Sequence, residues 1–270
     1  MKPGIFVFTS LWLLVQVSAC VGQERNGEPS PDVIPLIDSS VSRSKDEEFY
    51  PKRLTVPLQH GSILIKAPAS VRPGALRTAR VKILGILQKA DAEILDRLAG
   101  SHLEIAIIPL EMKLTDLLEF RHYAGKKNAF DQRYDILRGA TTYEIRSGVR
   151  SRPLIAIGED DILRLMPLGT AQSALHHEFG HALYLFGLSP EQRSEWESLY
   201  QEARTRHLFE NKYAMVNVDE FFPELTQAYF DTEPYFCSAS QLARVHPKAY
   251  KFLARVYSGA NTRPAELPPR

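Results

Sequence analysis

Two histidines and one glutamate stand at a spacing that suits a metal site. His177, Glu178 and His181 read H-E-x-x-H within residues 173–187. On a helix, two histidines four positions apart project from the same face, one turn above the other. Each ring could then give one nitrogen to a tetrahedral zinc ion, while Glu178 could act as a general base without binding the ion.

The short motif also has an ordinary explanation, because two histidines and a glutamate can fall at this spacing by chance. A further histidine, His176, stands beside the pair and cannot share its helix face. We therefore expect His176 to be structural or solvent-facing. A zinc site requires a third ligand from elsewhere in the chain.

The acidic stretch Asp219–Glu224 is the best source of that third ligand. Glu220 and Glu224 are four residues apart, so on a helix they share one face. One carboxylate can complete a His-His-Glu site that leaves a position for water, and the other can orient a ligand imidazole through its second nitrogen. Alternatively, both are solvated acids in the first turns of a helix.

The metzincin pattern is excluded, because it needs Gly and His at the third and sixth positions after the second motif histidine. This chain has Tyr184 and Gly187 at those positions.

Two segments together resemble the catalytic domain of anthrax lethal factor and are similar to the bacterial Pro-Pro endopeptidases. They are His177–Ala182 and Tyr213–Phe222, within a resemblance that covers mainly residues 100–260. The resemblance implies a zincin-like fold and a zinc endopeptidase of gluzincin type that acts on proteins or peptides. It implies that Glu220 is the third zinc ligand, that Glu224 supports the site from outside the ligand set, and that Tyr213 lies over the metal as a catalytic hydroxyl.

One residue departs from that family. Pro223 stands where the family usually carries a small helix former such as Ala. In a helix that starts at Asn217, the Pro223 ring would crowd the carbonyl of Asp219. We therefore expect the helix either to begin later or to kink just after Glu220.

The composition is that of an ordinary soluble globular protein. The 270 residues are 44% hydrophobic and 24% charged, with 33 basic against 32 acidic side chains and no basic run. This balance gives no reason to expect nucleic acid or an anionic membrane surface as a partner. No motif indicates the cleavage specificity or the oligomeric state.

The N-terminus has the features of an export signal. Residues 1–19 hold a short apolar stretch that ends in small residues, which is typical of a signal peptide. Residues 17–20, Val-Ser-Ala-Cys, resemble a bacterial lipobox, so we expect lipidation at Cys20 and an envelope protein whose membrane contact is this anchor. The alternative is ordinary cleavage after Ala19 and a secreted, soluble product. The other cysteine, Cys237, is expected to be a buried small hydrophobe.

The remaining pattern predicts one α+β domain over residues 49–261, after a disordered tether at 20–48 and before a flexible tail at 262–270. Strands are expected near Lys52–Leu58, Ser62–Lys66, Leu103–Ile108, Thr141–Ile145 and Leu154–Ile157. Helices are expected over 73–100, between a Thr170 cap and a left-handed turn at Gly187, and near 189–206, Val218–Phe230 and Pro247–Val256.

The predicted function is a metal-dependent endopeptidase with Glu178 as base. Two alternatives remain: a catalytically inactive envelope lipoprotein that uses the same fold for binding, and a zinc hydrolase that acts on non-peptide bonds. A substrate strand is expected to add to the sheet edge near Gly148–Leu154. A latent enzyme, in which residues 21–48 cover the cleft, is compatible with the sequence.

Overall fold

The computed structural model describes residues 33–34, 43–128, 131–146, 149–164, 173–232 and 237–258. The predicted signal peptide, Cys20, Thr170 and the predicted tail at 262–270 lie outside the described residues. No helix in the described ranges is long and apolar enough to cross a membrane.

The strands of the described residues form one six-stranded mixed sheet in the order β1-β5-β6-β4-β3-β2. Strands β2 and β3 make an antiparallel hairpin, β3, β4 and β6 run parallel to one another, and β5 returns antiparallel to β6. Their bounds are β1 Val33–Ile34, β2 Lys52–Leu58, β3 Gly61–Ala67, β4 Glu104–Ile108, β5 Gly139–Arg146 and β6 Val149–Gly158.

The helices lie mainly before β4 and after β6, which makes this an α+β fold. Their bounds are α1 Arg43–Phe49, α2 Pro73–Leu87, α3 Ala92–Gly100, α4 Glu159–Leu163, α5 Ala174–Ala182, α6 Pro190–Thr205, α7 Val218–Tyr229, α8 Ala239–Val245 and α9 Pro247–Ser258. Short 3-10 turns cover Leu114–Asp116, Leu118–Tyr123, Tyr134–Ile136 and Tyr213–Met215.

The two faces of the sheet are covered differently. Side chains alternate along a strand, so Ile105 and Ile107 of β4 face the main core with α2, α3 and α5, while Ala106 and Ile108 face a smaller core. The smaller core is completed by the 3-10 turns between β4 and β5. All four residues are buried, so β4 is a central strand, as its apolar run predicts.

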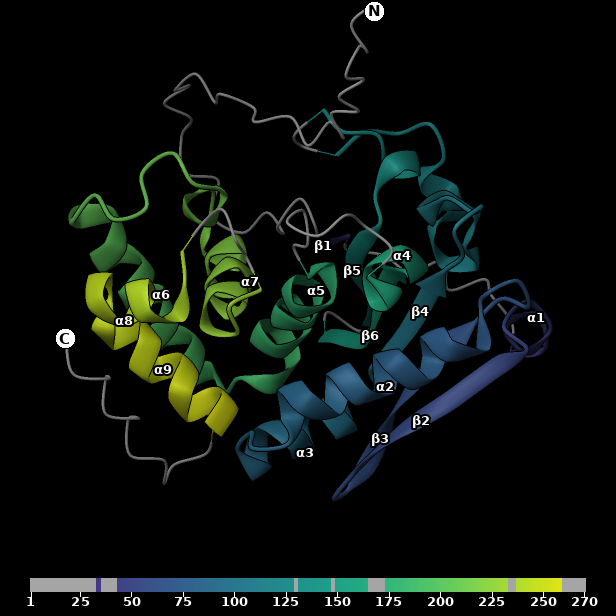
Figure 1. Ribbon diagram of the computed structural model, residues 1–270, viewed down its shortest axis with the longest axis horizontal. Helices are drawn as coiled ribbons and strands as arrows, with labels where there is room; N and C mark the ends of the chain where they lie inside the picture. Colours follow the sequence, from purple (N-terminus) through teal and green to yellow (C-terminus); the bar gives the residue numbers. More distant parts are fainter. Residues whose placement is uncertain are drawn as a thin grey trace, which may run out of the picture.

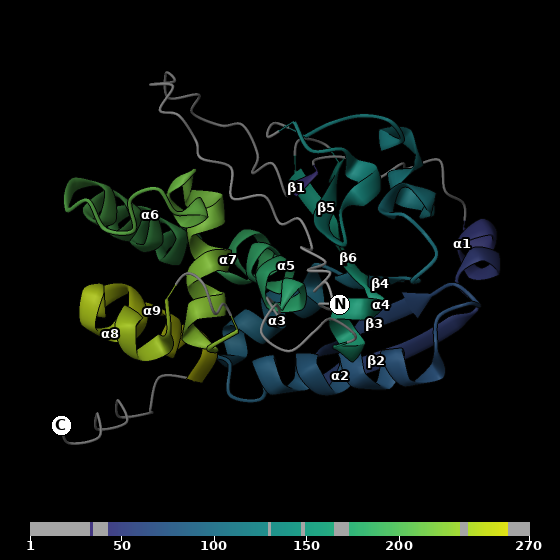
Figure 2. The same cartoon turned by 45° about the horizontal axis from the view of Figure 1, so that its top comes forward.

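Helix α5 lies between the sheet and the C-terminal helices. Figures 1 and 2 show α6, α7, α8 and α9 grouped on one side of α5 and the sheet on the other. Helix α5 packs on β5 and β6 with one side and on α7 with another. The motif helix is therefore enclosed by both halves of the fold.

Helix α1 is tied to the sheet by a buried lysine. The Lys66 Nζ lies 2.7 Å from carboxylate oxygens of Asp46, Glu104 and Glu119. Burial by itself lowers the pKa of Lys66, but Glu119 and Glu104 outweigh it and raise the pKa overall. Burial likewise raises the pKa of Asp46, but Lys66 and Arg53 lower it overall. Residues 43–48, at the end of the predicted tether, are thus helical and packed on the domain.

The element bounds and the strand order correct two of the expectations. The predicted helix over 73–100 is two helices, because α2 ends at Leu87 and the Asp91 side chain accepts from the Glu93 N–H to cap α3. The predicted docking edge at Gly148–Leu154 is wrong at Leu154, because β6 lies between β5 and β4 and Leu154 is in register with Thr142 and Glu104 on its two sides. Val149–Ser151 are in register with β5, the register with β4 begins at Leu154, and Gly148 lies outside the described residues.

Candidate metal centre

Helix α5 begins at Ala174, with Ser173 as its N-cap. The Asp161 carboxylate accepts from the backbone N–H groups of Ala174 and Leu175, at 3.1 and 3.2 Å. A carboxylate at this end also suits the positive N-terminal end of the helix dipole. The start of the motif helix is thereby fastened to the segment that follows β6.

The helix ends in a wider, π-helical turn over Leu183–Gly187, and no left-handed residue closes it. The expected left-handed turn at Gly187 is therefore wrong. The position is instead tightly packed: a Cβ at residue 187 would lie 3.0 Å from Leu183 and 3.2 Å from Ile94.

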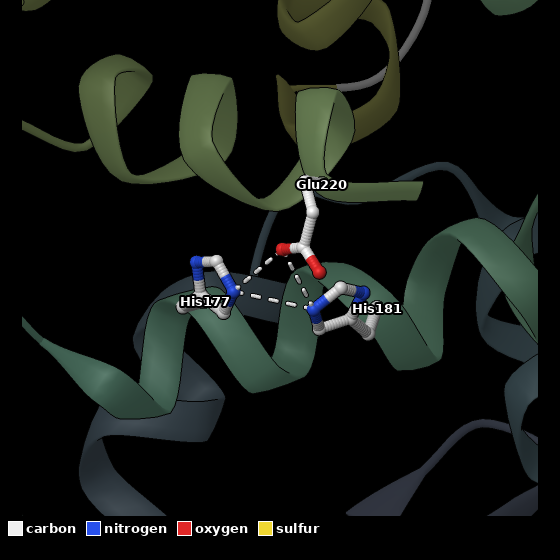
Figure 3. A group of neighbouring side chains, drawn as sticks. All are labelled: His177, His181 and Glu220. Atoms are coloured by element: carbon white, nitrogen blue, oxygen red, sulfur yellow. Dashed lines mark hydrogen bonds and ion pairs between the residues drawn. The ribbon is translucent and has the colours of Figure 1, made fainter. Parts of the chain in front are cut away.

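The structure brings His177, His181 and Glu220 together in one buried group. The Nε2 atoms of His177 and His181 are 3.2 Å apart, and the Glu220 Oε2 lies 3.3 Å from the first and 3.5 Å from the second. Figure 3 shows both rings on α5 turned toward the Glu220 carboxylate, which reaches in from α7.

This triangle fits a tetrahedral zinc ion. Ligand atoms at about 2.0–2.1 Å from a tetrahedral centre are separated from one another by about 3.3–3.4 Å. The three measured edges, 3.2, 3.3 and 3.5 Å, fall at that separation. Two imidazoles and one carboxylate are also a donor set that zinc favours, with one position left for water.

Glu220 is aimed by the start of α7. The Asn217 side chain caps the helix by accepting from the Glu220 N–H at 2.8 Å. The helix begins at Val218, one residue after Asn217, and runs through Pro223 to Tyr229. The alternative of a later start, which would have left Pro223 in the free first turn, is therefore wrong, and Pro223 lies inside the helix at the cost of one helical hydrogen bond.

Pro223 faces α5 at a point where only glycine fits. A Cβ at Gly180 would lie 2.7 Å from the Cα of Pro223. The two helices therefore approach closely at this pair, which brings the carboxylate of α7 to the rings of α5.

Charge in the group favours a cation at its centre. Burial by itself raises the pKa of Glu220, but His181 and His177 lower it overall. Burial by itself lowers the pKa of His181, but Glu220 raises it overall. The carboxylate thus stays ionised in a buried position, where a positive partner between the three groups stabilises it.

A second pair of side chains holds the His177 ring. Its Nδ1 lies 3.0 Å from the Gln227 Oε1 and 3.3 Å from the Glu224 Oε1. The Gln227 Nε2 donates to the Ser173 carbonyl, so its Oε1 must face the ring. His177 therefore carries its proton on Nδ1 and directs the Nε2 lone pair toward His181 and Glu220.

Glu224, which the sequence predicted would orient a ligand imidazole, lies 3.3 Å from the His177 Nδ1. Gln227, which lies nearer to the same nitrogen, was not found from the sequence. Its helix position, seven residues after Glu220, puts it on nearly the same face of α7. That spacing is the signal that could have found it.

The predicted base, Glu178, is 4% exposed and turns toward β5. The Thr141 hydroxyl lies 2.8 Å from its Oε2 and 3.0 Å from its backbone carbonyl. Gly139, two residues earlier on β5, also faces it: a Cβ there would lie 2.8 Å from the Glu178 Oε1. Neither β5 residue was found from the sequence.

Tyr213 is the first residue of a 3-10 turn that precedes α7. Its ring centroid lies 6.2 Å from that of His177. The predicted hydroxyl-bearing side chain is thus beside the three-residue group.

His176 and Cys237, which were expected to be outside the site, do not belong to the group of His177, His181 and Glu220. The His176 Nδ1 pairs with the Ser173 hydroxyl at 2.7 Å, and its ring packs near Phe230. Burial, then Lys82 and Arg164, lower the pKa of His176 to about 4. Cys237 is buried in the main core as a free thiol.

A family model described as "Anthrax toxin lethal factor, N- and C-terminal domain" matches residues 77–256, about two thirds of the chain. The matched range contains α5, α7 and every residue of the group described above. No curated protein matches the chain.

Proposed function

The chain belongs to the anthrax toxin lethal factor family, and from that premise we propose that it is a zinc-dependent endopeptidase with a zincin-like active site. The observation that carries the proposal is the buried triangle of two imidazole nitrogens and one carboxylate oxygen. Its edges match those of a tetrahedral zinc site.

His177, His181 and Glu220 would hold the ion, with His177 oriented by Gln227 and Glu224. Bound there, zinc supplies a Lewis acid that makes water acidic near neutral pH and polarises a carbonyl group. Because the three ligands are buried on two helices that pack closely, their geometry is set before substrate arrives.

Glu178 is the proposed general base. It follows the first ligand in sequence and projects from a neighbouring position on the same helix, so it would lie next to a bound ion without binding it. As water attacks the scissile carbonyl carbon, Glu178 accepts one proton from that water. It then delivers the proton to the nitrogen of the leaving amine.

Tyr213 is the proposed hydrogen-bond donor to the oxyanion that develops during the attack. It lies beside His177, and its phenolic O–H can donate without changing its own charge. A donor that acts mainly in the transition state raises kcat more than it tightens substrate binding.

The decisive experiment combines metal analysis with turnover on the full exported chain. Protein purified without added zinc is analysed for metal and assayed with a peptide library. In Glu178→Gln, turnover should fall by about 10²–10⁴-fold while zinc stays bound. In the control Glu197→Gln, at an exposed position on α6, turnover should be unchanged.

Each other outcome points to a different function. Zinc without peptide hydrolysis would favour the inactive binding protein, and hydrolysis of other bonds alone would favour a non-peptide hydrolase. Full turnover in Glu178→Gln would reject Glu178 as the base.

We also propose that the protein is exported and held at the cell envelope by lipid on Cys20. The support is the lipobox-like Val-Ser-Ala-Cys at residues 17–20, after an apolar stretch. Mass analysis of the mature N-terminus checks this. Acyl chains on Cys20 are expected, and an unmodified N-terminus would favour a secreted, soluble protein.

A further inference from the structure

We propose that Gly139 and Thr141 of β5 are positioning residues for the general base: Thr141 holds one oxygen of the Glu178 carboxylate, and Gly139 leaves room for the other. The inference rests on the proposed function. It adds a second structural element to the active site, since the ligands come from α5 and α7 and these two residues come from the sheet.

The two residues share one face of β5. Side chains alternate along a strand, so residues 139 and 141 point to the same side, which is the side on which α5 packs. Thr141 is in register with Ile155 of β6 and is 0% exposed. The strand that supports Glu178 is therefore held by the sheet and does not depend on a loop.

Thr141 restrains one carboxylate oxygen. Its hydroxyl has a single proton, which lies within reach of the Glu178 Oε2 at 2.8 Å and the Glu178 carbonyl at 3.0 Å. An ionised carboxylate is the stronger acceptor. The hydroxyl therefore donates mainly to Oε2, and the carbonyl is a secondary acceptor.

Gly139 provides the space for the other oxygen. A Cβ at residue 139 would lie 2.8 Å from Oε1, 3.3 Å from Cγ and 3.4 Å from Cδ of Glu178. The backbone at Gly139 is not in the left-handed region, so alanine is allowed there by conformation. The requirement for glycine comes from the Glu178 side chain.

The two contacts act on opposite oxygens of the same carboxylate. One oxygen is held by a hydrogen bond, and the other occupies space that a side chain at residue 139 would fill. A displacement of about 1 Å at a reacting group can lower a rate by about 10²-fold. The position of the base therefore depends on two β5 residues that bind neither zinc nor substrate in this proposal.

Gly139→Ala is the sharpest test, because the atom it displaces is the end of a flexible side chain. The variant should fold with a nearly unchanged unfolding midpoint and bind zinc at the same stoichiometry. Its kcat should fall by about 10–100-fold with little change in KM. The control is Gly85→Ala on α2, where nothing lies within 4 Å of an added Cβ; its kcat should match the parent.

Thr141→Val and Thr141→Ser test the hydrogen bond. The Val variant removes the donor at nearly constant volume, and its kcat should fall while zinc stoichiometry is kept. The Ser variant keeps a hydroxyl and should recover most of kcat. If the Thr141 side chain had only a structural role, the substitutions would change stability and KM, and Thr141→Ser would not restore kcat.

Unfolding of the zinc-free protein provides a readout that does not need activity. Thr141→Val should lower the unfolding midpoint by about 2–4 °C, and the loss should shrink in a Glu178→Met background, where the acceptor is gone. An equal loss in both backgrounds would show that the hydroxyl serves the backbone carbonyl, and would overturn the Thr141 assignment.

The two proposals fail in different ways. Full turnover in Glu178→Gln would overturn the proposed function itself. Collapse in Glu178→Gln, together with full kcat in Gly139→Ala and Thr141→Val, would leave the function standing and overturn this inference alone.

Discussion

Gly180 of α5 and Pro223 of α7 meet where the two helices that bring the metal-ligand group together approach closely. A Cβ at Gly180 would lie 2.7 Å from the Pro223 Cα and 3.1 Å from its Cβ. The contact is with backbone, which cannot move aside as a flexible side chain can. The separation of the two helices, and with it the reach of Glu220 to His177 and His181, depends on this pair.

Gly180→Ala should therefore weaken both the fold and the metal site. Overpacking of this kind costs about 1–3 kcal/mol, which exceeds the gain of about 0.5–1 kcal/mol from replacing a helical glycine by alanine. Urea unfolding measures the first effect, and zinc titration of the folded variant should show weaker binding than in the parent. The control Gly85→Ala, also on a helix but in open space, should not lose stability. Parental zinc affinity in Gly180→Ala would contradict the role of this contact.

Gln227→Leu should lower zinc affinity. The substitution removes the nearer of the two acceptors beside the His177 Nδ1 and leaves the ring less well oriented. Losses from such outer contacts are about 10–100-fold in metal affinity. Competition with a chromophoric chelator measures the change. Gln201→Leu, at an exposed position on α6, serves as the control, and equal affinities in the two variants would show that Gln227 does not orient the ring.

Removing zinc should destabilise the protein. A ligand that binds only the folded state adds about 4 kcal/mol when its free concentration is 1,000 times its dissociation constant. A chelator should therefore lower the unfolding temperature of the parent, and added zinc should restore it. His181→Ala lacks one ligand of the group, so its unfolding temperature should hardly respond to either treatment. A full response in His181→Ala would place the zinc elsewhere.

Tyr213→Phe should lower kcat by about 10²–10³-fold, with a much smaller change in KM, if its hydroxyl stabilises the oxyanion. Steady-state kinetics with one peptide substrate separates the two parameters. Zinc content should be unchanged, because Tyr213 is outside the ligand group. Tyr250→Phe on α9 is the matched control. A raised KM at constant kcat would instead assign Tyr213 to substrate binding.

Acid should weaken the attachment of α1 through Asp46. The folded-state pKa of Asp46 is lowered. The ionised carboxylate therefore contributes fully to folding stability above its unfolded pKa of 3.8. This contribution is lost as the pH falls through the lower folded-state pKa. At pH 6, Asp46→Asn should lower the free energy of unfolding by about 1.5–3 kcal/mol. The difference from the parent should shrink below pH 3.8. Glu48→Gln, exposed on the same helix, should show no such trend.

The local parts of the site could be read from the chain. Residues four apart on a helix share a face whatever surrounds the helix, so the pairing of His177 with His181 needed only a helix to form. The capping signal at Ser189-Pro190 likewise predicted the start of α6, and the alternating or continuous apolar runs predicted β2, β3 and β4. The spacing of Glu220 and Glu224 singled out their segment, and the resemblance to a known family singled out Glu220 as the third ligand.

The contacts between distant segments could be seen only in the folded chain. Thr141 and Glu178 are 37 residues apart, and His177 and Gln227 are 50 apart; nothing in the local pattern of either partner indicates the other. The same reason explains the error over the sheet edge, since the order of β4, β6 and β5 depends on how the chain crosses over and not on any strand's composition. Spacing along one helix therefore predicted which atoms could bind a metal, whereas the packing of α5 against α7 and β5 decided where those atoms and the base lie. Helical geometry is a property of neighbouring residues, but close packing depends on surfaces that meet only when the whole domain has folded.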